Sequence, residues 1–127
     1  MAIEQRIYPI GFCKAGADLS AKQHYIVKVT GDRTVGLTTA AGEAALGILQ
    51  NKPKSGEAAD VLAIGISKVV VGVGGLTAGT QYEAANDGTA ITVAAAKVGL
   101  GTVLTGAAAG ELATVTIGVA AGATIAA

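Results

Sequence analysis

Three glutamates follow directly on a glycine, and these are the first places in the chain where side chains could do chemistry. They are Gly42-Glu43, Gly56-Glu57 and Gly110-Glu111. Carboxylates that meet in space could serve acid–base catalysis or bind a cation. Glycine, however, adopts the positive φ that closes a turn, and a glutamate after it stays solvated where a strand begins. We therefore expect turns rather than carboxylate sites at all three positions.

The other reactive side chains lack the neighbours that catalysis requires. His24 is the only histidine, and a general base needs a nucleophile beside it. None of the serines at positions 20, 55 and 67 has the G-x-S-x-G setting of a hydrolase. Cys13 is the only cysteine, which excludes a disulfide framework within the chain, and no Cys/His spacing predicts a zinc site. We expect no catalytic residue and no metal site, so the protein is not expected to be an enzyme.

Two glycine-rich segments resemble phosphate-binding loops only in part. Residues 11–16 have the glycine spacing of a P-loop but are followed by Ala17-Asp18 instead of Lys-Ser/Thr. Residues 72–77 lack the third glycine of a dinucleotide-binding fingerprint. No cofactor is therefore expected.

Composition excludes further classes of function. Apolar residues make up 51% of the 127 residues, aromatic residues only 3%, and the formal net charge is zero. Such a chain has no basic surface for nucleic acid and no polybasic stretch for a membrane. The first residues, MAIEQR, lack the pattern of a signal peptide, so synthesis in the cytoplasm is expected. A core with so few aromatic residues favours oligomerisation.

Frequent turn signals between β-branched runs predict an all-β fold. Asn86-Asp87-Gly88 and Gly31-Asp32 are typical of hairpin turns, and residues 61–67 and 69–73 predict core strands. A skeleton of Leu-Gly, eight residues and Gly-Glu occurs at residues 46–57 and again at residues 100–111. We expect a small antiparallel β-barrel or sandwich of about eight short strands. It would span residues 18–118 and contain a duplicated hairpin unit at residues 46–65 and 100–118, followed by a C-terminal tail at residues 119–127.

Residues 1–17 do not join this pattern. Pro9 and Gly11 make a helix improbable there, so the segment is either an extended N-terminal arm or the first, edge strand. Apolar residues on an arm usually indicate a partner surface. The sequence is compatible with both interpretations.

The order of segments over residues 18–118 resembles the small capsid decoration, or cement, proteins of tailed bacteriophages. The most specific block is GILQNKPKSGEAADV with the following IGISKVVVG. The resemblance implies a structural protein of the virion on the capsid exterior that binds and stabilises the lattice of the major capsid protein. Two features depart from the pattern of these proteins: the second hairpin unit has no proline loop, and a Gly/Ala-rich tail follows Gly118.

The resemblance also implies partners and contact residues. The partners are the major capsid protein and other copies of the chain, with a trimer favoured over a dimer. The expected anchors of the arm, with Tyr8 and Phe12 as its hot spots, are Ile3, Ile7, Tyr8, Ile10 and Phe12. The alternative functions are a carbohydrate-binding or adhesive β-module on the particle surface and a small hydrolase built around His24.

Overall fold

The fold is built from nine β-strands, and the described residues contain no helix. The computed structural model describes residues 6–94 and 99–118, with side chains from residue 12 onward. The strands are β1 (Arg6–Ala15), β2 (Ile26–Gly31), β3 (Thr34–Leu37), β4 (Gly47–Leu49), β5 (Ala58–Val70), β6 (Gln81–Ala84), β7 (Ala90–Thr92), β8 (Gly101–Thr105) and β9 (Leu112–Ile117). The expected all-β class is confirmed, with nine strands in place of about eight.

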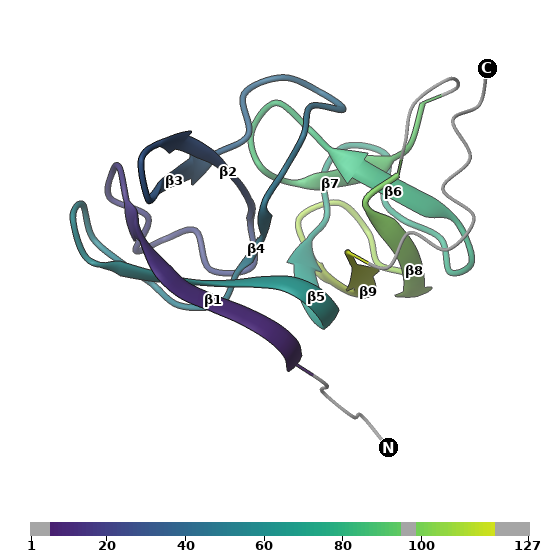
Figure 1. Ribbon diagram of the computed structural model, residues 1–127. Coiled ribbons are helices and arrows are strands. Elements are labelled where there is room, and N and C mark those ends of the chain that lie inside the picture. Colours follow the sequence, from purple (N-terminus) through teal and green to yellow (C-terminus); the bar gives the residue numbers. More distant parts are fainter. Residues whose placement is uncertain (1–5, 95–98, 119–127) are drawn as a thin grey trace.

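Five strands close a small barrel, which we call the first ring. Its order is β1-β3-β2-β4-β5, and β5 pairs back onto β1. These strands gather on the left of Figure 1. Valine, leucine and alanine side chains fill its interior, and the buried set is Cys13, Ala15, Leu19, Val27, Val35, Leu49, Ala59 and Val61. All five strands contribute to this set, and Leu19 joins it from the segment between β1 and β2, so the ring has its own core.

The remaining strands form a second ring together with the C-terminal half of β5. β5 pairs with β9, and the order continues through β8 and β6 to β7. Val71, just after β5, bridges Ala90 of β7 and so returns to the starting strand. Tyr82 lies at the centre of this half, fully buried, and its hydroxyl donates a 2.7 Å hydrogen bond to the Thr116 carbonyl. β5 is therefore shared by both rings. The expected run at residues 61–67 and the first two residues of the expected run at 69–73 belong to this one strand, which Lys68 does not interrupt.

The two rings have the same pairing scheme. β2 pairs with β3 and β4, and β4 with β5, just as β6 pairs with β7 and β8, and β8 with β9. The registers of the strands also correspond. In the first ring Val27 pairs with Leu37 and Gly47, and in the second ring Tyr82 pairs with Thr92 and Gly101. Likewise, Leu49 pairs with Val61 in the first ring, and Val103 pairs with Val115 in the second. The strands that close the two rings correspond too. In the first ring Ala15 pairs with Val35 and Cys13 with Ala59, and in the second ring Val71 pairs with Ala90 and Val69 with Ala113. The duplication therefore extends beyond the unit visible in the sequence.

The Gly-Glu pairs close turns, as expected, but their carboxylates also bond to the backbone. Gly56 and Gly110 have φ values of +83° and +85°. The Glu57 carboxylate accepts a 2.7 Å hydrogen bond from the Lys54 amide, and Glu111 accepts one of 3.2 Å from Ala108. Both glutamates are exposed directly before a strand, as expected, and each one also holds the loop that precedes it.

Glu43 holds its loop most tightly. Its Oε1 accepts hydrogen bonds from the Thr39 and Ala40 amides at 2.5 and 3.2 Å, and Lys28 Nζ lies 3.0 Å away. The Thr39 amide, followed by Lys28, lowers the pKa of Glu43 to about 2. The charged carboxylate is thus favoured in the folded state.

Replacing Glu43 by glutamine is expected to flatten the acid limb of the stability profile. A lowered pKa in the folded state stabilises the protein above the ordinary value of 4.5, and this stabilisation is lost as the pH falls toward about 2. Thermal unfolding midpoints between these pH values should therefore fall more steeply for the wild type than for Glu43→Gln. Parallel profiles of the two proteins would contradict the assignment.

Candidate partner-binding site

The residues expected to contact a partner fall on β1 and just before it. Ile3 lies outside the described residues. Tyr8 and Ile10 belong to β1 and pair with Ile64 and Val61 of β5, and Ile7 lies on the same strand. The backbone of Arg6–Ala15 is thus a strand of the first ring, as the first-strand interpretation expects. A role of these residues in binding a partner stays a prediction.

Phe12 is the expected anchor whose side chain the structure describes, and it is 63% exposed although it is a large apolar residue. The guanidinium carbon of Arg33 lies 4.0 Å from the centroid of the Phe12 ring. Arg33 Nε also donates a 3.1 Å hydrogen bond to the Phe12 carbonyl. The aromatic ring and the cation therefore form one exposed unit that joins β1 to the β2–β3 turn.

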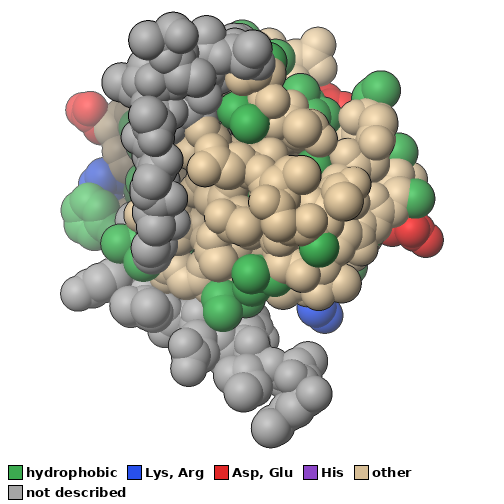
Figure 2. Space-filling view, turned by 90° about the vertical axis from the view of Figure 1, so that its right-hand side faces the viewer, with side chains coloured by type: hydrophobic (Ala, Val, Ile, Leu, Met, Phe, Trp, Pro, Cys, Tyr) green, Lys and Arg blue, Asp and Glu red, His purple; other side chains and the backbone are tan. Residues whose placement is uncertain are grey.

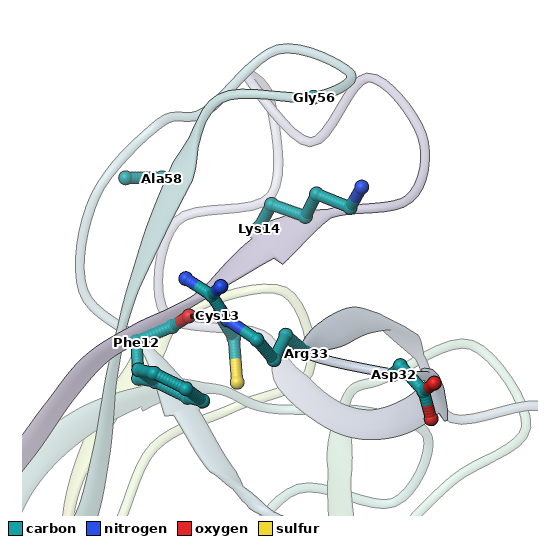
Figure 3. Close-up of a pocket in the computed structure, with 7 residues that line it drawn as sticks. All are labelled: Phe12, Cys13, Lys14, Asp32, Arg33, Gly56 and Ala58. Carbon is teal, nitrogen blue, oxygen red and sulfur yellow. Dashed lines mark hydrogen bonds between the residues drawn. The ribbon is translucent and has the colours of Figure 1, made fainter.

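A polar cavity of 340 Å³ opens beside this pair. Its lining comes from β1, from the β2–β3 turn, from the turn before β5 and from the first residue of β5. The lining residues are Phe12, Cys13, Lys14, Asp32, Arg33, Gly56 and Ala58. Figure 3 shows the Arg33 guanidinium next to Phe12, whereas the Asp32 carboxylate lies apart at the far side of the turn. The site thus offers an aromatic face, two cations, Arg33 and Lys14, and the single carboxylate of Asp32.

Backbone contacts hold the two sides of the cavity together. The Lys14 amide donates a 2.7 Å hydrogen bond to the Arg33 carbonyl, and Lys14 pairs with Thr34 in the parallel contact of β1 with β3. Arg33 itself has a φ of +53°, in the left-handed region that residues other than glycine rarely adopt. The expected hairpin turn at Gly31-Asp32 is therefore centred one residue later, on Asp32 and Arg33.

The side chains considered for catalysis or metal binding are His24, Cys13 and Ser67, and the described residues show no metal-binding cluster. No group of three or more His, Cys, Asp or Glu side chains suited to a metal ion occurs among them. Cys13 is buried in the first-ring core, and the Ser67 hydroxyl donates to the neighbouring Lys68 carbonyl. The amide of His24 donates to Leu49 at 2.7 Å, in the turn that leads into β2. Cys13 and Ser67 thus serve packing and local hydrogen bonding.

Among the described residues, a second cation–π pair joins Lys22 Nζ to the Tyr25 ring at 4.8 Å from its centroid, and neither residue lines the cavity. The other large exposed apolar residues are Val29, Val73, Leu104 and Leu112. On the face shown in Figure 2, the hydrophobic side chains are scattered and the charged ones lie near its edges. In the described parts of the chain, no helix has the length and apolarity needed to cross a membrane. The Phe12–Arg33 unit and its cavity, which we call the Phe12 cleft, are therefore the strongest candidate site.

Comparison with known proteins supplies a likeness in fold. Neither a protein-family model nor a curated protein matches the sequence. Among solved structures, the chain is similar to the N base of the head fiber protein gp8.5 of bacteriophage phi29, with a TM-score of 0.67 and 16% identity. The match covers 87% of this chain and 91% of that chain. The likeness in fold therefore extends over most of both chains.

Proposed function

We propose that this chain is a structural protein of a phage virion that binds the outer surface of the capsid as a decoration protein. The observation that carries the proposal is the fold likeness of nearly the whole chain to the base of a phage head fiber. The sequence resemblance to capsid decoration proteins points to the same class independently. In this role the protein is not an enzyme and needs no cofactor.

Stabilisation of the capsid lattice would come from many weak contacts. Copies that bridge neighbouring capsid subunits add interface area at each junction, and repetition over the shell raises the avidity. A small protein with zero formal net charge suffers little repulsion between crowded copies. We propose a homo-oligomer, a trimer before a dimer, because closed symmetry matches the symmetry axes of a shell.

A second candidate follows from the nature of the structural neighbour. That chain is the base of a head fiber, and it is covered over 91% of its length. The present chain would then anchor a fiber to the capsid instead of forming a complete decoration protein. Both candidates require attachment to the capsid and differ in what projects outward.

Binding to assembled heads tests the proposal. Purified protein is mixed with heads that lack it and sedimented through a density gradient, and the heat stability of the heads is measured with and without the protein. We expect co-sedimentation and a higher temperature of head disruption. Absence of both effects would overturn the proposal, and a specific glycan-array signal in its place would favour an adhesive module. Electron cryomicroscopy of decorated virions separates a compact cap from a fiber base.

A further inference from the structure

We propose that the Phe12 cleft binds an acidic side chain, flanked by an apolar one, on the surface of a partner protein. The inference rests on the proposed function, since it states the chemistry that the capsid side would present. It starts from the juxtaposition of an exposed aromatic ring, a stacked guanidinium and a second cation around one cavity.

Comparison of the two rings shows that the fold does not require this unit. Val29 pairs with Val35 across the turn of the first ring, and Ala84 pairs with Ala90 across the turn of the second. Counted from these pairs, Arg33 and Gly88 occupy the same position in the two turns. Cys13 and Val69 are equivalent, so Lys68 stands in the second ring where Phe12 stands in the first. The second ring therefore has neither the phenylalanine nor the arginine at these positions. The same pairing scheme closes in both cases. The Phe12–Arg33 pair is therefore an addition to the first ring.

The conformation of Arg33 supports this view. Its φ of +53° is one that glycine adopts freely, and Gly88 has a φ of +81° at the equivalent position. An unfavourable backbone conformation that surrounding contacts maintain is a reason to look for a function. Here the equivalent turns both require a positive φ, and the Lys14 amide also holds the Arg33 backbone through its carbonyl. Arginine thus occupies a position that suits glycine, and its stacking on Phe12 and its hydrogen bond to the Phe12 carbonyl fix the guanidinium at the edge of the cavity.

Carboxylate is the group that this arrangement fits best. Nε of Arg33 is engaged with the Phe12 carbonyl, which leaves the two terminal nitrogens of the guanidinium for a bidentate carboxylate. Lys14 lines the same cavity and adds a second positive charge, although its ammonium, like the carboxylate of the lining residue Asp32, lies apart from the guanidinium (Figure 3). The exposed face of Phe12 offers apolar contact to a neighbouring side chain of the partner. Aromatic and arginine residues are also the types enriched at interface hot spots.

The charge of the whole chain argues against a polyanion as the occupant. The formal net charge is zero, and two cations at one cleft do not make the extended basic surface that nucleic acid requires. A free inorganic anion would use the cations but not the aromatic face. A protein side chain uses both, and we therefore commit to a protein partner.

Peptide titration followed by NMR tests the proposal without the capsid. The probe is the blocked peptide Gly-Glu-Leu-Gly, with Gly-Gln-Leu-Gly and inorganic phosphate as comparisons. We expect the glutamate peptide to shift the Phe12 ring and Arg33 Nε–H signals at millimolar concentrations, and Arg33→Gly to weaken binding about tenfold or more. Arg33→Gly introduces the residue found in the equivalent turn, so the variant is expected to fold. Lys68→Ala removes the same charge at the position equivalent to Phe12 and should leave peptide binding unchanged.

The outcomes separate this inference from the proposed function. Equal shifts with the glutamine peptide or with phosphate, or equal binding by Arg33→Gly and the wild type, would overturn the inference. In the head-binding assay, we expect Arg33→Gly to bind more weakly than Lys68→Ala. If the wild type and Arg33→Gly bind heads equally, the inference fails and the proposed function stands. If the wild type does not bind heads but the peptide still binds through Arg33, the proposed function fails and the inference stands.

Discussion

Alanine at Gly47 or Gly101 is expected to destabilise the fold by about 3 kcal/mol or more, because each glycine permits a close approach of two strands. A Cβ on Gly47 would lie 2.8 Å from the Leu62 carbonyl carbon, and one on Gly101 would lie 2.7 Å from that of Thr116, with the carbonyl oxygens closer still. Neither glycine can move away, because Gly47 pairs with Val27 on its other side and Gly101 pairs with Tyr82. Relief would require breaking the strand pairing in that ring.

Urea unfolding of a set of glycine variants measures this effect. Gly31→Ala is the matched control, since its added Cβ would meet its nearest atom at 3.8 Å and no positive φ is involved. Gly56→Ala tests backbone conformation alone, because its φ is +83° with open space around it, and we expect a loss of about 1 kcal/mol. If Gly47→Ala and Gly101→Ala cost no more than Gly31→Ala, the close approach would not be the reason for these glycines.

The glycines at positions 47, 56, 101 and 110 explain why the Leu-Gly and Gly-Glu repeat is visible in the sequence. The Leu-Gly of each copy is fixed by the narrow space between β4 and β5 or between β8 and β9, and the Gly-Glu is fixed by a turn with positive φ. Both constraints act on the backbone and therefore leave the same residue types in both copies. The β-branched runs and hairpin signals predicted the all-β class for a similar reason, since local turn chemistry and side-chain shape determine them.

Long-range features had no such local signal. The parallel contact of β1 with β3 and the sharing of β5 between two rings depend on pairing between distant segments. Lys68 was expected to separate two strands, but its side chain is exposed, so the strand continues through it. The equivalence of β1 with the end of β5 was also missed, because Cys13 and Val69 share a position in the fold without sharing a sequence pattern.

The candidate site was predicted only in part. The preference of interface hot spots for aromatic residues predicts Phe12, whereas no local sequence pattern indicates Arg33. One available signal was the contrast between Asp32-Arg33 and Asp87-Gly88 at two hairpin turns. Arginine in place of the usual glycine becomes informative only when the two turns are known to be equivalent, which the strand register shows.

Deletion of residues 1–17 is expected to unfold the first ring, whereas deletion of residues 1–5 should leave it intact. β1 contributes Cys13 and Ala15 to the first-ring core. The Ala15 amide donates to the Glu57 carbonyl at 2.9 Å, and the Ala15 carbonyl accepts from the Gly56 amide at 2.8 Å. Removing β1 would expose this core and leave β3 and β5 each without one neighbouring strand. A domain with a typical stability of about 5–15 kcal/mol does not tolerate such a loss.

Hydrogen exchange and head binding on the two truncated proteins measure the outcome. We expect the shorter deletion to keep slow exchange in β2 to β5, and the longer one to lose it together with cooperative unfolding. A longer deletion that stays folded but no longer binds heads would instead show that residues 1–17 act as a separable arm. Since Phe12 lies on the same strand as Cys13 and Ala15, a folded β1 places the exposed ring at a fixed position on the barrel surface. Closing the first ring and presenting the cleft would then be two consequences of one strand.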